Sequence, residues 1–315
     1  ALSGHSGQTI GGAAAAYGVA NGGQVEIGMQ DYEAHSAFIA PARPKAELWR
    51  LILGLFVATI TYIALMIVIM AVGIVFSAGP DIVAQLAVWN EAGSIGPSPI
   101  DRALAEIGAG RSPLSTLVIL ATFLGMIGGV VVAGLVLHGR GLASMMGPAE
   151  LLWRHGRLGA LIAAVALLLS GFLPPSLTPE ANLGMATWLT VLPAALLLIL
   201  IQTGAEEIVF RGYIQQQLAA RFASPWVWMV LPSLIFATGH YSPAQYGENA
   251  VLVAAAAGLF GIFAADLTAR TGSIGAAWGL HFANNAIAIV LVSLEGPLGG
   301  VALYTISEEV LTPDL

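Results

Sequence analysis

The sequence has no cysteine, and only 9% of its 315 residues are charged. Without cysteine there can be no disulfides, thiolate metal ligands or cysteine nucleophiles. Any chemistry must therefore use carboxylate, imidazole, hydroxyl, amide or guanidinium groups. The 11 Lys and Arg residues are outnumbered by 18 Asp and Glu residues and form no basic cluster, so nucleic acid is not an expected partner.

Apolar residues make up 57% of the chain, and the mean hydropathy is +0.84. A soluble globular domain usually carries about 25% charged residues. So few charges cannot cover a water-exposed surface, which excludes an ordinary soluble domain. We predict an all-α polytopic membrane protein whose main surroundings and partners are membrane lipids.

Charge-free apolar runs show where this chain is expected to cross the bilayer, which takes about 20 helical residues. Four runs are long and three are shorter: 51–77, 114–137, 183–205 and 273–294, then 158–173, 226–239 and 250–265. The sequence therefore predicts a bundle of seven transmembrane helices, with an eighth allowed and the active site inside the bundle.

The composition also divides the chain into three regions. Residues 1–46 are rich in Gly and Ala and are expected to form a disordered N-terminal tail. Residues 47–295 form the predicted transmembrane domain, and residues 296–315 form a short acidic tail.

The distribution of basic residues predicts the orientation, because Lys and Arg are retained on the cytoplasmic side. Alternate loops place nine basic residues on one side and only Arg102 and Arg111 on the other. We therefore expect a multi-pass protein of the inner (plasma) membrane with a cytoplasmic N-terminus. The nine are Arg43, Lys45, Arg50, Arg140, Arg154, Arg157, Arg211, Arg221 and Arg270.

Two pairs of glycines have the four-residue spacing that lets membrane helices pack closely. They are Gly125 with Gly129, and Gly275 with Gly279. We interpret both pairs as helix-packing devices.

Ionisable residues next to an apolar span are costly, so they mark candidate functional positions. Glu206, Glu207 and Arg211 directly continue the run 183–205. Glu207 and Arg211 have the four-residue spacing of a helical ion pair. This pairing leaves Glu206 as the carboxylate without a partner nearby in the sequence.

Two histidines lie in or at the end of later apolar runs. His240 follows Phe236 by one helical turn. His281 and Asn285 are four residues apart, so they share one helix face and can point into the bundle together. Asn284 points about 100° away and is the weaker candidate.

A carboxylate, two imidazoles and an amide that converge within a membrane favour water activation. Glu206 would take a proton from water, with a histidine holding that water, while His281 and Asn285 would stabilise an oxyanion. Glu206, His240 and His281 could instead hold a divalent metal such as zinc. Because the sequence has no HExxH motif, we favour a site without metal or other cofactor.

The three motifs together resemble a known family. Glu206-Glu207-x-x-x-Arg211, Phe236-x-x-x-His240 and His281-x-x-x-Asn285 are similar to the motifs of the CAAX protease and bacteriocin-processing family, which includes the type II CAAX prenyl endopeptidases. The resemblance covers about residues 183–294. It implies an intramembrane endopeptidase in which Glu206 activates water and Glu207 and Arg211 orient it.

The resemblance further implies His240, His281 and Asn285 as the other catalytic residues, with Phe236 as a structural one. The expected substrate is a membrane-bound peptide or protein, in some members lipidated. Ten arginines against one lysine favour a bacterial source. Two alternatives remain: a non-catalytic membrane partner or immunity protein with a structural polar network, and an ion- or proton-coupled transporter.

Overall fold

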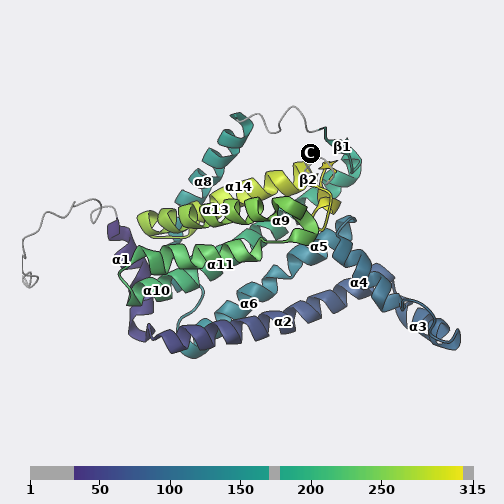
Figure 1. Ribbon diagram of the computed structural model, residues 1–315, viewed down its shortest axis with the longest axis horizontal. Coiled ribbons are helices and arrows are strands. Elements are labelled where there is room, and N and C mark those ends of the chain that lie inside the picture. Colours follow the sequence, from purple (N-terminus) through teal and green to yellow (C-terminus); the bar gives the residue numbers. More distant parts are fainter. Residues whose placement is uncertain (1–31, 170–177, 308–315) are drawn as a thin grey trace, which may run out of the picture.

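The computed structural model describes residues 32–169 and 178–307, and this part of the chain is mainly helical (Figure 1). Its first half contains α1 Glu33–Ile39, η2 Ala40–Lys45, α2 Leu48–Ala78, α3 Ile82–Glu91, α4 Pro99–Ala109, α5 Pro113–Ala121, α6 Phe123–Ala133, η3 Gly134–His138, α7 Ala143–Met146 and α8 Ala149–Leu169.

The second half contains α9 Met185–Glu207, η4 Ile208–Gln215, α10 Gln216–Arg221, η5 Trp226–Val230, α11 Leu231–Gly239, α12 Pro243–Tyr246, η6 Gly247–Asn249, α13 Ala250–Thr271, α14 Gly275–Ala286, η7 Ile287–Leu291 and η8 Gly299–Val301. Three short strands complete it: β1 Glu180–Ala181, β2 Val292–Leu294 and β3 Tyr304–Ile306.

Five helical stretches in the described part of the chain are long and apolar enough to cross a membrane: 48–78, 113–138, 149–169, 185–221 and 243–271. Two shorter apolar helices, 226–239 and 275–291, match the two remaining predicted spans. The predicted run 158–173 extends past residue 169, beyond the described residues. The helical membrane character is confirmed, and the count of seven spans stays a prediction.

Many large apolar side chains on these helices are exposed, as the bilayer requires of a helix that faces lipid. On α2, Ile52 and Phe56 are each 62% exposed. Such a surface is typical of a helix that faces lipid, so the exposed fractions and the helix lengths point to the same surroundings.

A small sheet interrupts the all-α architecture that the sequence predicts. The strand order is β1-β3-β2, with β1 antiparallel and β2 parallel to β3. β3 falls in the region expected to be an acidic tail; residues 308–315 of that tail lie outside the described part. Strands of two or three residues are too short to carry a hydrophobic pattern that sequence analysis can detect.

The N-terminal region also differs from the expected disordered tail. Residues 1–31 lie outside the described part, but residues 33–45 are helical, and Phe38, Ile39 and Ala42 are buried. The side chain of Tyr32 donates a hydrogen bond to Asp266 of α13. The prediction of disorder is wrong for residues 33–45, because these apolar side chains join the core.

The predicted glycine seams are confirmed. A Cβ atom at Gly129 of α6 would collide with the Ala58 carbonyl of α2, and one at Gly279 of α14 with the Gly156 carbonyl of α8. The two helix pairs therefore approach so closely that only glycine fits at these positions. The second contact fixes α14, which carries His281.

Candidate active site

Glu206 and Glu207 are the last two residues of α9, and the π-helical stretch η4, which follows directly, contains Arg211. π-helical turns within α-helices occur often at functional sites. Glu207 is completely buried, and Arg211 and Glu206 are 2% and 8% exposed. The structure thus holds two carboxylates and a guanidinium inside the helical bundle.

The predicted ion pair is confirmed. Arg211 Nη1 lies 3.2 Å from Glu207 Oε1, and Arg211 Nη2 donates to the Gly261 carbonyl of α13 at 3.3 Å. Phe236 and Phe260 lie against the guanidinium, 5.0 and 5.8 Å from its carbon to the ring centroids. Arg211 therefore neutralises Glu207 in an apolar aromatic setting that excludes water.

His281 lies between the two carboxylates. Its Nδ1 is 2.8 Å from Glu207 Oε1, and its Nε2 is 3.5 Å from Glu206 Oε2. A carboxylate accepts hydrogen bonds, so Nδ1 carries a proton. Glu206 therefore has a partner after all, one that lies far away in the sequence.

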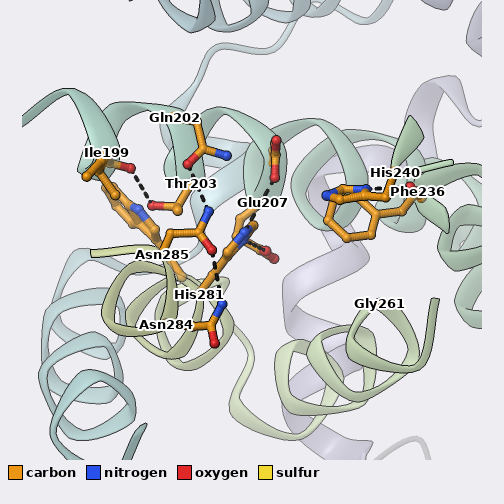
Figure 2. Close-up of polar contacts among 12 residues, drawn as sticks. Ile199, Gln202, Thr203, Glu207, Phe236, His240, Gly261, His281, Asn284 and Asn285 are labelled. Carbon is orange, nitrogen blue, oxygen red and sulfur yellow. Dashed lines mark hydrogen bonds and ion pairs between the residues drawn. The ribbon is translucent and has the colours of Figure 1, made fainter. Parts of the chain in front are cut away.

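Asn285 lies one turn after His281 on α14, as the spacing predicts, and contacts α9. Its Nδ2 donates to Gln202 Oε1 at 3.0 Å, and its Oδ1 accepts from Asn284 Nδ2 at 3.1 Å (Figure 2). Asn284, the weaker candidate, is exposed and donates to Asn285.

His240 lies just after the last residue of α11. Its Nδ1 is 2.9 Å from the Phe236 carbonyl, and its ring packs on the Phe236 ring with 4.4 Å between centroids. A carbonyl oxygen can only accept, so Nδ1 holds the proton and a neutral ring presents Nε2 as an acceptor. Phe236 therefore fixes the tautomer of His240.

A cavity of about 510 Å³ joins several of these residues. Its polar lining consists of Gln202, Glu206, His240, Gln245, Tyr246, Asn285 and Ser293. Most of the rest of its lining is apolar and comes from α5, η7, β2 and the residues after β2: Ile119, Leu120, Ile289, Val292, Leu294 and Leu298. Glu207, Arg211 and His281 are not part of this lining and lie behind Glu206. The cavity can thus hold water and an apolar peptide segment beside one carboxylate.

The alternative metal site was predicted from Glu206, His240 and His281. Among the described residues, no group of three or more His, Asp and Glu side chains is placed to hold a metal ion. In this arrangement both ring nitrogens of His281 face carboxylates. The three side chains therefore do not fit a metal centre as they stand.

Sequence analysis missed three residues that build the site. Gln202 lies one turn before Glu206 on the same face of α9, a spacing that could have identified it. The Gly261 carbonyl and the Phe260 ring come from α13, 50 and 49 positions beyond Arg211, and nothing in their local sequence signals a contact.

Comparison with known proteins then bears on this site. Residues 187–287 match the family model described as type II CAAX prenyl endopeptidase Rce1-like. The predicted family resemblance is confirmed. The Rce1-like segment contains all three motifs, from Glu206 to Asn285.

One curated relative is the "Uncharacterized protein YyaK" of Bacillus subtilis (strain 168), 31% identical over 130 residues. The match covers 41% of this chain and 43% of the relative, which is less than half of either protein. No solved structure matches the chain.

Proposed function

We propose that this protein is an intramembrane endopeptidase that hydrolyses a peptide bond of a membrane-associated peptide or protein with water activated by Glu206. The observation that carries this proposal is the shared cavity, which Glu206, His240 and Asn285 line together. All three residues belong to the segment that matches the Rce1-like family model. The geometry suits a glutamate mechanism better than a metal one, because His281 already serves the two carboxylates.

The charges of the buried cluster support Glu206 as the base. Glu207 is balanced by Arg211, and an unbalanced buried charge is costly. One further proton between Glu206 and His281 Nε2 makes the cluster neutral. With that proton on His281, Glu206 is ionised and able to take a proton from water.

The reaction then needs three steps. Glu206 removes a proton from a water molecule, and the water oxygen attacks the carbonyl carbon of the scissile bond. Asn285 Nδ2 has a second N–H that can donate to the resulting oxyanion. As the C–N bond breaks, the proton on Glu206 passes to the departing amine nitrogen.

The remaining residues have distinct roles in this proposal. His240 Nε2 accepts a hydrogen bond from the attacking water. His281, Glu207 and Arg211 are positioning residues that hold the Glu206 carboxylate at the cavity wall. This places His281 on the carboxylate side, whereas the sequence motif alone suggested the oxyanion side.

The apolar lining of the cavity favours a substrate segment that lies in or at the membrane. A lipidated, CAAX-like peptide is one form of such a substrate, and the match to prenyl endopeptidases supports that class. We place the protein in the plasma membrane of a bacterium.

The test is cleavage by purified protein in detergent of a library of quenched fluorescent peptides, prenylated and unprenylated. We expect Glu206→Gln to reduce cleavage at least 100-fold. Glu150→Gln makes the same chemical change at an exposed residue of α8 and should keep full activity. Cleavage that survives in Glu206→Gln contradicts the mechanism, and no cleavage by the wild type favours a non-catalytic partner.

The same assay tests the role of metal. After exhaustive chelation and metal analysis, we expect metal-free protein to retain its activity. Activity that disappears and returns with added zinc would overturn the glutamate mechanism and restore the metal alternative.

A further inference from the structure

The small sheet ends in the candidate active site. In the order β1-β3-β2, one edge of β2 pairs with β3 and the other has no strand beside it within the described chain. β2 follows α14, the helix that carries His281 and Asn285, after the π-helical stretch η7 (Figure 1). The open edge of β2 is thus linked to the site by one continuous segment.

The cavity runs along this open edge. Val292, Ser293 and Leu294 all line the cavity that contains Glu206. Side chains alternate between the two faces of a strand, so a cavity beside one face would meet only every second residue. Contact with three residues in succession indicates that the cavity follows the edge of the strand.

The hydrogen bonds of β2 show which backbone groups face the cavity. Glu295 N–H donates to the Ile306 carbonyl of β3 at 3.0 Å. Because residues alternate along a parallel strand, Ser293 also faces β3, while Val292 and Leu294 direct their backbone groups to the other edge. The Val292 N–H donates to the Ile287 carbonyl, so the Val292 carbonyl and the Leu294 N–H remain for a ligand. The Leu294 carbonyl accepts from Ser293 Oγ at 3.1 Å and has a second lone pair for a ligand N–H.

We propose that the substrate binds as an extended strand along the open edge of β2. Main-chain hydrogen bonds hold it there, while Glu206 acts on a peptide bond further along the substrate. Strand addition to an exposed sheet edge is a general way to bind peptides regardless of most side chains. This inference rests on the proposed peptidase function and adds how the substrate is held.

Geometry sets the register of this strand. Asn285 and Val292 are seven residues apart along α14 and η7, which corresponds to about 10 Å of helix. An extended peptide covers that distance with about three residues. The first substrate residue paired with β2 should therefore lie about three positions from the scissile bond, and the next paired residue two positions beyond.

The experiment uses unaltered protein and a backbone N-methyl scan of a quenched peptide that the wild type cleaves. N-methylation at the two paired positions should raise KM about 3- to 10-fold each, the effect of losing one hydrogen bond. The same change at the residue between them should have much less effect. A uniform response, or none, overturns strand pairing while the proposed function stands. Failure to cleave any parent peptide contradicts the function itself.

A pair of variants tests the protein side. Leu294→Pro and Leu294→Ala both remove the leucine side chain, but only proline removes the N–H, and it does so at an edge where proline is tolerated. We expect the proline variant to have a KM about 3- to 10-fold above that of the alanine variant. Equal KM values in two folded variants would contradict the proposal. If the proline variant does not fold, the N-methyl scan decides.

Discussion

Glu206 and Glu207 are neighbours in the sequence but have opposite surroundings. Glu206 lines a cavity of about 510 Å³, whereas Glu207 is completely buried and contacts Arg211 and His281. The first carboxylate can meet water and substrate, and the second can only act on other side chains. The two residues should therefore respond differently to the same substitution.

We predict that Glu207→Gln destabilises the protein by about 3–5 kcal/mol, because it removes the carboxylate that contacts the buried Arg211 charge. Glu206→Gln should abolish cleavage with a much smaller change in thermal stability, since its side chain reaches the cavity. Thermal unfolding in detergent, measured alongside the cleavage assay, separates the two effects. A similar loss of stability in both variants would argue against the division of roles.

For single residues, contacts within one helical turn could be predicted from spacing in the sequence, whereas contacts between distant segments could not. The Glu207–Arg211 pair is one helical turn long, and helix geometry alone predicts it. The contact between His281 and Glu207 joins residues 74 positions apart, and only the packing of α14 on α9 determines it. The contact between Asn285 and Gln202, 83 positions apart, was missed for the same reason.

Among the helices, the contact between α14 and α8 fixes the position of His281. We predict that Gly279→Ala destabilises the protein by about 1–3 kcal/mol and lowers activity, because the new methyl group collides with the Gly156 carbonyl. Gly108→Ala is the matched control: this helical glycine of α4 has open space where a Cβ would lie. It should be neutral or slightly stabilising. Equal stabilities of the two variants would refute the packing argument.

The stability of the protein should depend on pH through His35 in the N-terminal helix α1. This ring is 8% exposed and stacks on Trp228 with 4.6 Å between centroids. Burial, and secondly the charge of Arg43, lower the pKa of His35 to about 4. The folded state therefore favours the neutral ring, and protonation opposes folding.

We expect His35 to contribute full stability above about pH 6.5, where the ring is neutral in both states, and progressively less as the pH falls to about 4. The loss should reach about 3 kcal/mol at most. Thermal unfolding of wild type and His35→Leu across this range provides the measurement. The difference between them should change with pH; a constant difference would show that His35 titrates normally.

The elements that sequence analysis predicted are the long apolar helices, because a bilayer requires a length and composition that few other structures share. The three strands and α1 were missed. Each is short, and each is stabilised by contacts with distant segments: β3 by β1 and β2, and α1 by α10 and α13. Such elements have no periodic pattern of their own.

For the whole molecule, the absence of cysteine makes the predicted orientation directly measurable. Ser94 and Ala143 are exposed, and the distribution of basic residues predicts that they lie on opposite sides of the membrane. We expect a membrane-impermeant maleimide to label Ser94→Cys in intact cells and Ala143→Cys only after permeabilisation. The reverse pattern would mean that the N-terminus faces outwards.

The contact of His281 with the α9 carboxylates has a consequence for how the protein is made. Synthesis proceeds from the N-terminus at about 5–20 residues per second. His281 follows Glu207 by 74 residues, so the ribosome makes Glu207 roughly 4–15 s before its second partner, His281. Arg211 arrives almost at once and can accompany Glu207 into the bilayer, whereas Glu206 must wait for α14. The charged cluster is therefore complete only after α14 has been made, and a nascent chain that stops before α14 lacks the imidazole that contacts both carboxylates.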